Sequence, residues 1–516
     1  MSTKLIEALK KTSQYPHLAT QIEVIETHLS WVVLTGPFAY KIKKPLALGF
    51  QDFTTLAKRK EYCEKEVHFN QTLAGPIYIE AVAIYGTEDA PSFIEKGPAL
   101  EYAVKMHEFP QENLLRVYAE QNKISKRHVE SIASTLALFH QQTTLCPSNL
   151  SFGSPDEIFA PVKDNFQALK ALAIAQPHLD TLEHIEKWST NTFNHLRSIM
   201  QQRKDSGHVR ACHGDLHLGN IVMLKNEPVI FDCIEFNESF RYTDFINDVA
   251  FLAMDLEHLG KASLANHFVN RYFEISMDYD GIALLRFYKC YRAVVRAKVT
   301  GLLLDQQNSP DAKNEHLQSD FAAFLALAKS YTESQKPELM IMMGPSGSGK
   351  TLYSEELLTK QAAFRLRSDV LRKQLFGLDP LTKTTPLQKE SLYCVEATQT
   401  LYQRLQTLAA QLIQHGYSVI IDATCLKEWQ RSLFHEVAKK QHITFKIYLF
   451  VCQIDVLEQR IIDRATYGDV SDADLSVLAK QMDEAEPLND DEEMLTTFIP
   501  AEVIDNLIDN KEQPHA

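Results

Sequence analysis

The chain has 516 residues, of which 45% are apolar and 23% charged, and its net charge is −14. This composition is typical of folded globular proteins and excludes a largely disordered chain, and at roughly 150 residues per domain the length predicts about three structural units. The negative charge argues against duplex DNA binding by the whole chain, because such binding depends on lysine and arginine side chains that neutralise phosphates. Much of the excess acid lies after residue 483, so residues 336–482 are mildly basic.

The sequence carries no pattern typical of export or membrane insertion. The first ten residues are charged and lack the apolar core of a signal peptide. No uncharged apolar run approaches the roughly 20 residues that a membrane span requires. The eight cysteines form no CxxC pair, so neither a zinc site nor a disulfide framework is indicated. We therefore expect a cytoplasmic protein with reduced thiols and no membrane association.

The first half predicts a strand-rich part followed by a larger helical part. Residues 31–43 are apolar on both sides of a Thr35-Gly36-Pro37 turn, which indicates a β-hairpin. A helix is expected over 55–73, and strands over 82–85 and 102–106. From about residue 125 the pattern is helical, apart from a hairpin around 213–232, and it ends with helices at 282–304 and 313–333. We expect an α+β bilobal domain at 1–335, with an N-lobe at about 25–110 and a C-lobe at about 111–335.

The second half predicts a different fold. Residues 339–343 form a short apolar run that is followed by a glycine-rich loop and a helical segment at 352–358. Similar apolar runs recur at 418–422 and 445–451, with helical segments between them. Buried parallel strands have this pattern. We therefore expect residues 336–516 to form an α/β domain with a mainly parallel sheet and an acidic C-terminal tail.

A segment of the first half contains the residue types that phosphoryl transfer requires. It reads His213-Gly214-Asp215-Leu216-His217-Leu218-Gly219-Asn220, and Asp232 follows the apolar run 228–231. In the kinase pattern an Asp accepts the proton of the acceptor hydroxyl, while an Asn five residues later and a further Asp bind metal. Asp215 and Asn220 have this spacing. We therefore expect Asp215 to be the base, and Asn220 and Asp232 to be Mg²⁺ ligands.

A lysine that anchors the phosphates is expected on the second strand of the 31–43 hairpin. Lys41 is preferred and Lys43 is the alternative, because both lie on one face of that strand. Glu66 in the following helix is the expected partner, and Glu64 is the less favoured choice. Only Gly36 lies between the hairpin strands, so the usual glycine-rich phosphate loop is missing.

The motif HGDLHLGN, followed by Ile230-Phe231-Asp232, resembles the aminoglycoside phosphotransferase family more closely than the protein kinases. The resemblance covers about residues 25–330 and implies ATP-dependent phosphorylation of a hydroxyl group on a small molecule. His213, His140, Asp244 and Asp248 fit structural roles around this site. The cations with helical spacing in the C-lobe fit either a solvated face or a clamp for an anionic acceptor; they are Lys289, Arg292 and Arg296.

The second half contains a complete G-x-x-x-x-G-K-[ST] motif between a predicted strand and a helix. Backbone N–H groups of such a loop surround the phosphates, its lysine reaches the β- and γ-phosphates, and its hydroxyl binds Mg²⁺. We expect ATP, with GTP possible, bound together with Mg²⁺ that is held by Thr351 and by Asp422, which ends a predicted strand. The nucleotide-binding residues of the loop are Gly344, Ser346, Gly347, Ser348, Gly349, Lys350 and Thr351.

Further charged residues of the second half fit the acceptor side and a lid. Asp369 follows a short strand and is the expected general base, with Arg372 holding the acceptor or the transition state. Arg460 and Arg464 lie four apart on a predicted helix and resemble the lid arginines of small P-loop kinases. Residues 338–482 resemble zeta-toxin-like and polynucleotide-kinase-like P-loop kinases, and the whole arrangement resembles bacterial fusions of the two modules.

Three functional hypotheses follow. The leading one is a bifunctional phosphotransferase with two independent Mg·ATP sites that act on hydroxyl acceptors. In the second, the C-terminal half is a 5′-hydroxyl polynucleotide kinase. In the third, the N-terminal module is a nucleotide-binding sensor that regulates a toxin-like P-loop kinase. The sequence predicts a small-molecule hydroxyl acceptor or a nucleic-acid 5′ end as partner, and it leaves the oligomeric state open.

Overall fold

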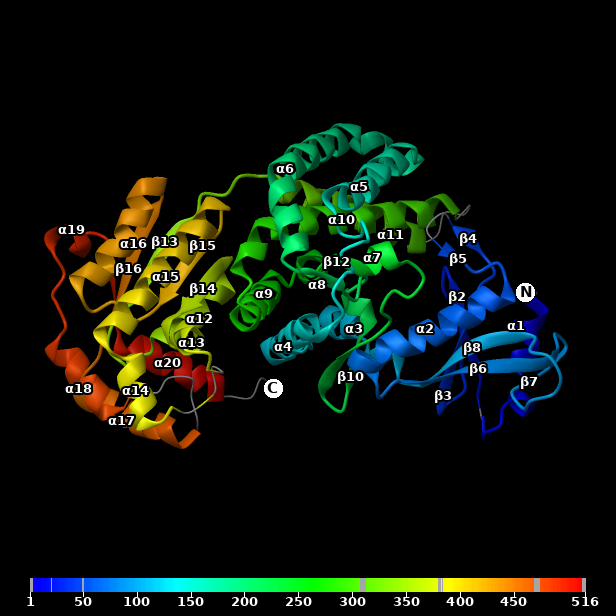
Figure 1. Cartoon of the computed structure of the whole chain (residues 1–516), viewed down its shortest axis with the longest axis horizontal. Helices are drawn as coiled ribbons and strands as arrows, with labels where there is room; N and C mark the ends of the chain where they lie inside the picture. Colours follow the sequence, from blue (N-terminus) through cyan, green and yellow to red (C-terminus); the bar gives the residue numbers. More distant parts are fainter. Residues whose placement is uncertain are drawn as a thin grey trace. The chain divides into compact units, whose positions relative to one another are not determined.

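The computed structural model describes residues 3–19, 21–48, 51–306, 312–378, 382, 384–467 and 474–512. The chain divides into two compact units, Met1–Lys261 with Ala283–Thr332, and Ala262–Ile282 with Glu333–Ala516. Figure 1 labels the elements of both units. The division differs from a linear boundary at residue 335 in one respect, because residues 262–282 pack with the second unit.

The first unit begins with an antiparallel sheet of strand order β1-β2-β3-β8-β6-β7. The expected hairpin, helix and two strands are all present, as β2, β3, α2, β6 and β8. Thr55 accepts a hydrogen bond from the backbone N–H of Lys58 and so caps α2. The elements are α1 (Thr3–Leu9), β1 (Glu23–Glu26), β2 (Ser30–Leu34), β3 (Phe38–Lys43), β4 (Ala47–Leu48), β5 (Gln51–Asp52), α2 (Leu56–Ala74), β6 (Tyr78–Thr87), β7 (Ala90–Ser92) and β8 (Glu101–His107).

The rest of the first unit is mainly helical, as expected for a C-lobe. Helix α8 is buried along almost its whole length, from Ile246 to Leu256, and forms the centre of this lobe. The elements are α3 (Leu115–Glu120), α4 (Lys126–Gln142), α5 (Pro155–Lys170), α6 (Leu179–Asp205), β9 (Val209–Ala211), β10 (Ile221–Leu224), β11 (Glu227–Ile230), α7 (Glu238–Arg241), β12 (Tyr242–Asp244), α8 (Ile246–His258), α10 (Ile282–Gln306) and α11 (Ala312–Ser330).

The second unit contains a five-stranded sheet of order β14-β15-β13-β16-β17, in which all neighbouring strands are parallel. The carboxyl ends of parallel strands share one edge, which is where ligands bind in open α/β sheets. The elements are α9 (Ala262–Ser276), β13 (Glu338–Met343), α12 (Lys350–Lys360), β14 (Ala363–Arg367), α13 (Ser368–Leu375), α14 (Pro386–Leu392), α15 (Val395–Gln414), β15 (Ser418–Asp422), α16 (Glu428–Gln441), β16 (Thr444–Val451), α17 (Ile454–Tyr467), α18 (Leu475–Asp483), α19 (Asp490–Glu493), β17 (Thr496–Pro500) and α20 (Ala501–Glu512).

The acidic C-terminal segment is a folded part of this unit. Strand β17 pairs with β16, and Ile499 and Ile504 are buried in the same apolar cluster as Met340 of the central strand. The acidic residues of this segment lie at other positions, so its apolar residues can pack in the core. All eight cysteines lie within the described residues and none forms a disulfide. Among the described residues no helix is long and apolar enough to cross a membrane.

Candidate active sites

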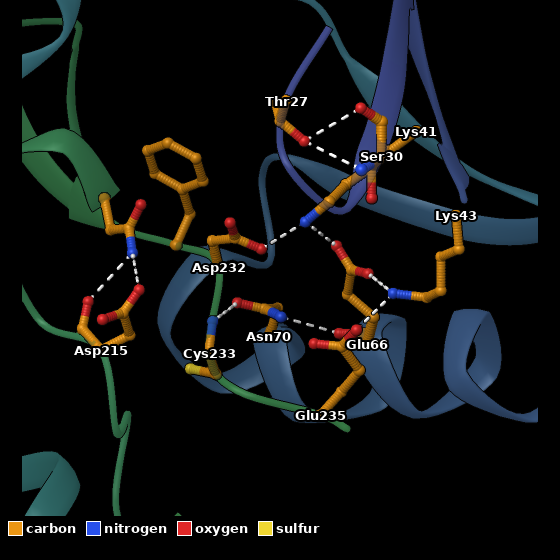
Figure 2. Close-up of polar contacts among 12 residues, drawn as sticks. Thr27, Ser30, Lys41, Lys43, Glu66, Asn70, Asp215, Asp232, Cys233 and Glu235 are labelled. Atoms are coloured by element: carbon orange, nitrogen blue, oxygen red, sulfur yellow. Dashed lines mark hydrogen bonds and ion pairs between the residues drawn. The ribbon is translucent and has the colours of Figure 1, made fainter. Parts of the chain in front are cut away.

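The first site begins at a network of lysines and carboxylates between β3 and α2. The Lys41 ammonium lies 2.8 Å from Glu66 Oε1 and 2.5 Å from Asp232 Oδ1, and Figure 2 shows it between these two carboxylates. Lys43 donates to Glu66 Oε2 at 2.5 Å and also contacts Glu235. Both lysines therefore occupy one strand face, as the alternation predicts. They differ because Lys41 reaches the expected metal ligand Asp232, while Lys43 is buried away from it.

These charged groups strongly shift one another's pKa values. Burial alone lowers the pKa of the Lys41 ammonium, but the nearby carboxylates of Asp232 and Glu66 outweigh it and raise this pKa well above its ordinary value. Burial alone raises the pKa of Glu66, but the ammonium groups of Lys41 and Lys43 lower it to about 2. Both lysines are thus charged and Glu66 is ionised at neutral pH. Glu64, the less favoured partner, instead lies on the exposed face, near Lys60 at 3.8 Å.

Asp232 is held in an uncommon backbone conformation. Its φ is +66°, in the left-handed region, where a non-glycine residue costs about 1–3 kcal/mol. The residues on both sides are fixed: the N–H of Phe231 donates to the carbonyl of Asn220 at 2.9 Å, and the N–H of Cys233 donates to Asn70 Oδ1 at 3.0 Å. The strained turn after β11 directs the Asp232 carboxylate toward Lys41 (Figure 2).

Asp215 and Asn220 lie on the loop between β9 and β10. The Asn220 side chain donates to the Asp215 carbonyl at 2.9 Å and lies 3.4 Å from its carboxylate. Burial alone raises the pKa of Asp215, but His217, Arg292 and His213 outweigh it and hold this pKa below its ordinary value. The Asp215 side chain is 44% exposed. An ionised carboxylate therefore opens into the cavity, as a proton acceptor requires.

Asp248 of α8 braces the same loop. Its carboxylate accepts the backbone N–H of His213 at 2.8 Å and of Gly214 at 2.9 Å, and it lies 3.2 Å from His140 Nε2. His213 Nε2 donates to the carbonyl of Phe231, and Nδ1 accepts the N–H of Asp215. The histidines and Asp248 therefore position the loop that carries Asp215. His140, Cys212 and Asp248 form a buried group of potential metal ligands, but His140 and Asp248 make the bonds above and the Cys212 thiol donates to the Thr243 carbonyl at 3.3 Å.

The C-lobe cations of helix α10 do not form one clamp. Arg292 is buried and donates to Asn247 Oδ1 and to the Gly214 carbonyl, each at 2.8 Å. Lys289 instead pairs with Glu257 at 2.5 Å. Arg292 and Asp248 thus both hold the loop that carries Asp215, whereas Asp244 pairs with Arg203 at 2.6 Å.

The turn between the first two strands of the sheet contains no glycine. The turn between β1 and β2, residues 27–29, lines the cavity, whereas Gly36 does not. Thr27 and Ser30 close this turn through two hydrogen bonds of 2.9 Å (Figure 2). The N–H groups of Thr35 and Gly36 both donate to Glu108 at 2.8 Å, so the predicted turn is capped by a carboxylate. The sequence did not single out residues 27–29, because the four-residue strand β1 before them has no clear alternation.

One cavity of about 1530 Å³ collects these groups. Lys41, Asp215, Asn220 and Asp232 line it, and its other wall comes from α5 and α10. Glu66 lies behind Lys41, fully buried. Carboxylate and carboxamide oxygens are the ligands that Mg²⁺ prefers, so Asn220 and Asp232 fit the expected metal.

The second site is built on the loop between β13 and α12. Gly347 and Gly349 have φ of +84° and +91°, which side chains rarely adopt. A Cβ on Gly349 would lie 2.5 Å from Ile504 Cγ2, so this position also has no room. The described residues Gly344 and Ser348 do not line the cavity, and a Cβ on Gly344 would lie 2.8 Å from the Ser348 hydroxyl. The remaining loop residues expected at the site line a cavity of about 1100 Å³; they are Ser346, Gly347, Gly349, Lys350 and Thr351.

The loop is occupied by groups of the chain itself. The Lys350 ammonium donates to the Pro345 carbonyl at 2.6 Å and lies 3.4 Å from the Ser348 hydroxyl. The backbone N–H of Ser346 donates to Gln481 Oε1 of helix α18 at 2.8 Å. These bonds engage two of the donors that a phosphate would use, the Lys350 ammonium and the Ser346 N–H. No local sequence signal places Gln481 of α18 against the loop, so only the structure reveals this contact.

Three expected residues lie at the carboxyl edge of the sheet. Asp422 ends β15, is buried, and accepts a hydrogen bond from the Ser354 hydroxyl at 3.3 Å. Asp369 lies in the first turn of α13, and both residues line the cavity with Thr351. The helix N-cap is Arg367, which makes no side-chain cap bond, so Asp369 is not used as a cap. The hydroxyl of Thr351 and the carboxylate of Asp422 are hard oxygen ligands that fit Mg²⁺.

The expected arginines have different surroundings. Arg372 is buried, donates to the Leu392 carbonyl at 2.6 Å, and lies over the Tyr393 ring at 4.5 Å. It therefore ties α13 to α14 while lining the cavity. Arg460 contacts the Gly347 carbonyl at 3.4 Å and pairs with Asp505. The side chain of Arg464 lies outside the described residues.

The geometry defines a class of protein. The first unit brings a β3 lysine, an α2 glutamate and the loop with Asp215 and Asn220 together as a kinase would, and the second carries a P-loop on a parallel sheet. The phosphotransferase enzyme family model matches residues 52–287, and the AAA domain model matches residues 339–488. The chain is therefore a kinase in which a domain of the phosphotransferase enzyme family precedes a P-loop kinase domain.

Similar proteins cover one or both modules. Uncharacterised proteins of Mycobacterium tuberculosis (strain H37Rv) and Mycobacterium bovis are 29% identical over 461 residues, which is 89% of this chain and of each relative. A choline/ethanolamine kinase family protein from Mesorhizobium loti is 12% identical with a TM-score of 0.38, over 64% of this chain and 99% of that chain. The APS kinase CysC of Mycobacterium tuberculosis, solved with AMPPNP and APS, is 20% identical with a TM-score of 0.24, over 35% of this chain and 99% of that chain.

Proposed function

We propose that the chain is a bifunctional phosphotransferase that moves the γ-phosphate of ATP to hydroxyl acceptors at two independent sites. The observation that carries this proposal is the contact of Lys41 with both Glu66 and Asp232, in the cavity that Asp215 and Asn220 also line. A lysine, two metal-ligand candidates and a base in one cavity are the parts that phosphoryl transfer needs.

At the first site, Lys41 would hold the nucleotide phosphates while Glu66 keeps its ammonium in place. Asn220 and Asp232 would hold Mg²⁺, which when bound offsets negative charge on the phosphates. Asp215 would orient the acceptor hydroxyl and accept its proton as the bond to phosphorus forms. Asp248 and Arg292 keep the Asp215 loop at a fixed position, and such positioning provides most of the catalysis in this chemistry.

At the second site, Lys350 would leave the Pro345 carbonyl and bind the β- and γ-phosphates. The loop N–H groups, including that of Ser346, would turn to phosphate oxygens. Thr351 and Asp422 would hold Mg²⁺, and Asp369 would accept the proton of the acceptor. Arg372 would face the acceptor, and Arg460 would cover the nucleotide from α17.

A 5′-hydroxyl polynucleotide end is a second candidate acceptor for the second site. The cavity includes the aromatic side chains of Tyr393, Tyr402 and Trp429 beside Arg372. Tyr402 and Trp429 meet edge to face at 5.3 Å. Aromatic rings next to an arginine offer a stacking surface for bases, and they serve equally for a small acceptor with a planar group.

The test is ATP turnover by the full chain in the presence of pooled metabolites and of single-stranded oligonucleotides. Asp215→Ala should lower turnover with one set of acceptors by at least about 100-fold, and Lys350→Ala should lower turnover with another set by a similar factor. Asp156→Ala and Lys360→Ala change exposed residues of the same types and should have no effect. Wild-type turnover in the Asp215→Ala/Lys350→Ala double variant would refute the proposal. Lys350-dependent labelling of oligonucleotide 5′ ends would select the polynucleotide acceptor.

A further inference from the structure

Helix α9 belongs to the compact P-loop unit although it lies within residues 52–287, which match the phosphotransferase family. It runs beside β14, the edge strand of the parallel sheet (Figure 1). The Asn270 side chain accepts the N–H of Arg365 at 2.7 Å and donates to the carbonyl of Ala363 at 2.8 Å. A carboxamide thus pairs with the open edge of the strand as a neighbouring strand would. Phe273 adds an edge-to-face contact with Phe364 at 5.7 Å.

One turn further along α9, Glu274 reaches the catalytic edge of the sheet. Its carboxylate lies 3.1 Å from Arg367 Nη1, and its backbone carbonyl accepts from the Gln374 side chain at 3.0 Å. Arg367 directly precedes helix α13 and Gln374 lies in its last turn, and this helix carries Asp369 and Arg372. Glu274 is only 8% exposed, so water screens this ion pair little.

Arg367 also faces Asp422. Its Nε lies 3.9 Å from Asp422 Oδ2, a distance too long for a hydrogen bond. Both side chains line the cavity that holds Lys350 and Thr351. Glu274 therefore holds the Arg367 guanidinium between two carboxylates, near Asp422 but beyond hydrogen-bond distance from it.

We propose that Glu274 is a positioning residue of the second site and that it acts through Arg367. This inference rests on the proposed phosphotransfer at that site. Without the Glu274 charge, Arg367 moves onto Asp422, forms a close ion pair, and competes with Mg²⁺ for that carboxylate. The phosphotransferase segment of the chain thus supplies a residue on which metal binding in the P-loop module depends.

The experiment uses the full chain with Asp232→Asn, which removes a metal ligand of the first site. Glu274→Gln should raise the Mg²⁺ concentration for half-maximal Lys350-dependent turnover by about tenfold, with the rate restored at saturating Mg²⁺. Electron paramagnetic resonance of Mn²⁺·ATP binding should give the same weakening without turnover. Glu274→Asp keeps the charge and should retain most of the affinity. In an Arg367→Gln background, Glu274→Gln should have no further effect.

The matched control is Glu338→Gln, because Glu338 pairs with Lys446 at 2.8 Å at the amino end of the central strand. This variant should leave metal dependence unchanged. Unchanged Mg²⁺ and Mn²⁺ dependence in Glu274→Gln, or an equal effect with and without Arg367, would overturn the proposal.

A chain without Lys350-dependent turnover would refute phosphotransfer but not the positioning contact. Hydrogen exchange of residues 367–375 without nucleotide separates the two cases. Exchange there should increase in Glu274→Gln and not in Glu338→Gln, and an unchanged pattern would overturn the contact itself.

Discussion

At the scale of single residues, Lys41 and Lys43 show how two equal side chains take different roles. They lie two residues apart on β3 and both contact Glu66, yet only Lys41 reaches Asp232, and only Lys43 is sealed beside Glu235. A cation that reaches a metal-ligand candidate is available to phosphates. A cation sealed between two buried carboxylates chiefly neutralises them.

Methionine substitution should separate these roles. Lys41→Met should reduce Asp215-dependent turnover by about 100-fold with little change in the thermal midpoint, because Lys43 still neutralises Glu66. Lys43→Met should destabilise the first unit by about 3–5 kcal/mol, since it leaves Glu66 and Glu235 buried without that cation. Acceptor-dependent turnover and thermal unfolding of both variants provide the measurement. The reverse pattern would assign the phosphate lysine to Lys43.

At the scale of elements, the P-loop depends on helix α20. Gly349 has a positive φ, and its missing side chain leaves the space that Ile504 of α20 fills. Helix α20 also contributes Asp505, which pairs with Arg460 of α17. The acidic segment after residue 483 is therefore a structural support of the nucleotide loop.

Gly349→Ala should abolish Lys350-dependent ATP binding, because the added methyl group meets Ile504 at 2.5 Å. Gly377→Ala is the matched control: its φ is +69°, but a Cβ there meets nothing within 4 Å. That control should cost about 1–2 kcal/mol of backbone strain and retain binding. Calorimetric titration with an ATP analogue in the Asp232→Asn background measures both. Equal binding by the two variants would mean that the loop tolerates the methyl group.

At the scale of the whole molecule, the two modules are not consecutive along the chain. Residues 262–282 pack with the second unit, and the chain rejoins the first unit at α10. Helix α9 thereby covers β14, an edge that would otherwise present unpaired backbone groups. A cut at residue 335 keeps the P-loop and removes this cover.

Residues 336–516 expressed alone should therefore be less stable than the second unit of the full chain, by on the order of 5 kcal/mol, from lost hydrogen bonds and the lost burial around Phe273. They should also self-associate through β14. Thermal unfolding and sedimentation velocity measure both effects, and a peptide spanning 262–282 should restore part of the midpoint. A monomeric fragment as stable as the full chain would contradict the argument.

Local patterns were sufficient for much of this protein. The hairpin at 31–43, the helix at 55–73 and the parallel strands around the P-loop follow from apolar periodicity and glycine placement, which depend on neighbours in sequence. The spacing of Asp215 and Asn220, or of Gly344 and Lys350, is likewise local, so the sequence alone could single out these residues as candidates.

Contacts between distant segments required the tertiary structure. Alternation placed Lys41 and Lys43 on one face, but only the position of Asp232, 191 residues after Lys41, distinguishes them. The turn at 27–29, the bond from Gln481 to the P-loop and the pairing of Glu274 with Arg367 likewise join elements far apart in the chain. Such contacts are decided by how elements pack, and no periodicity within a single segment encodes them.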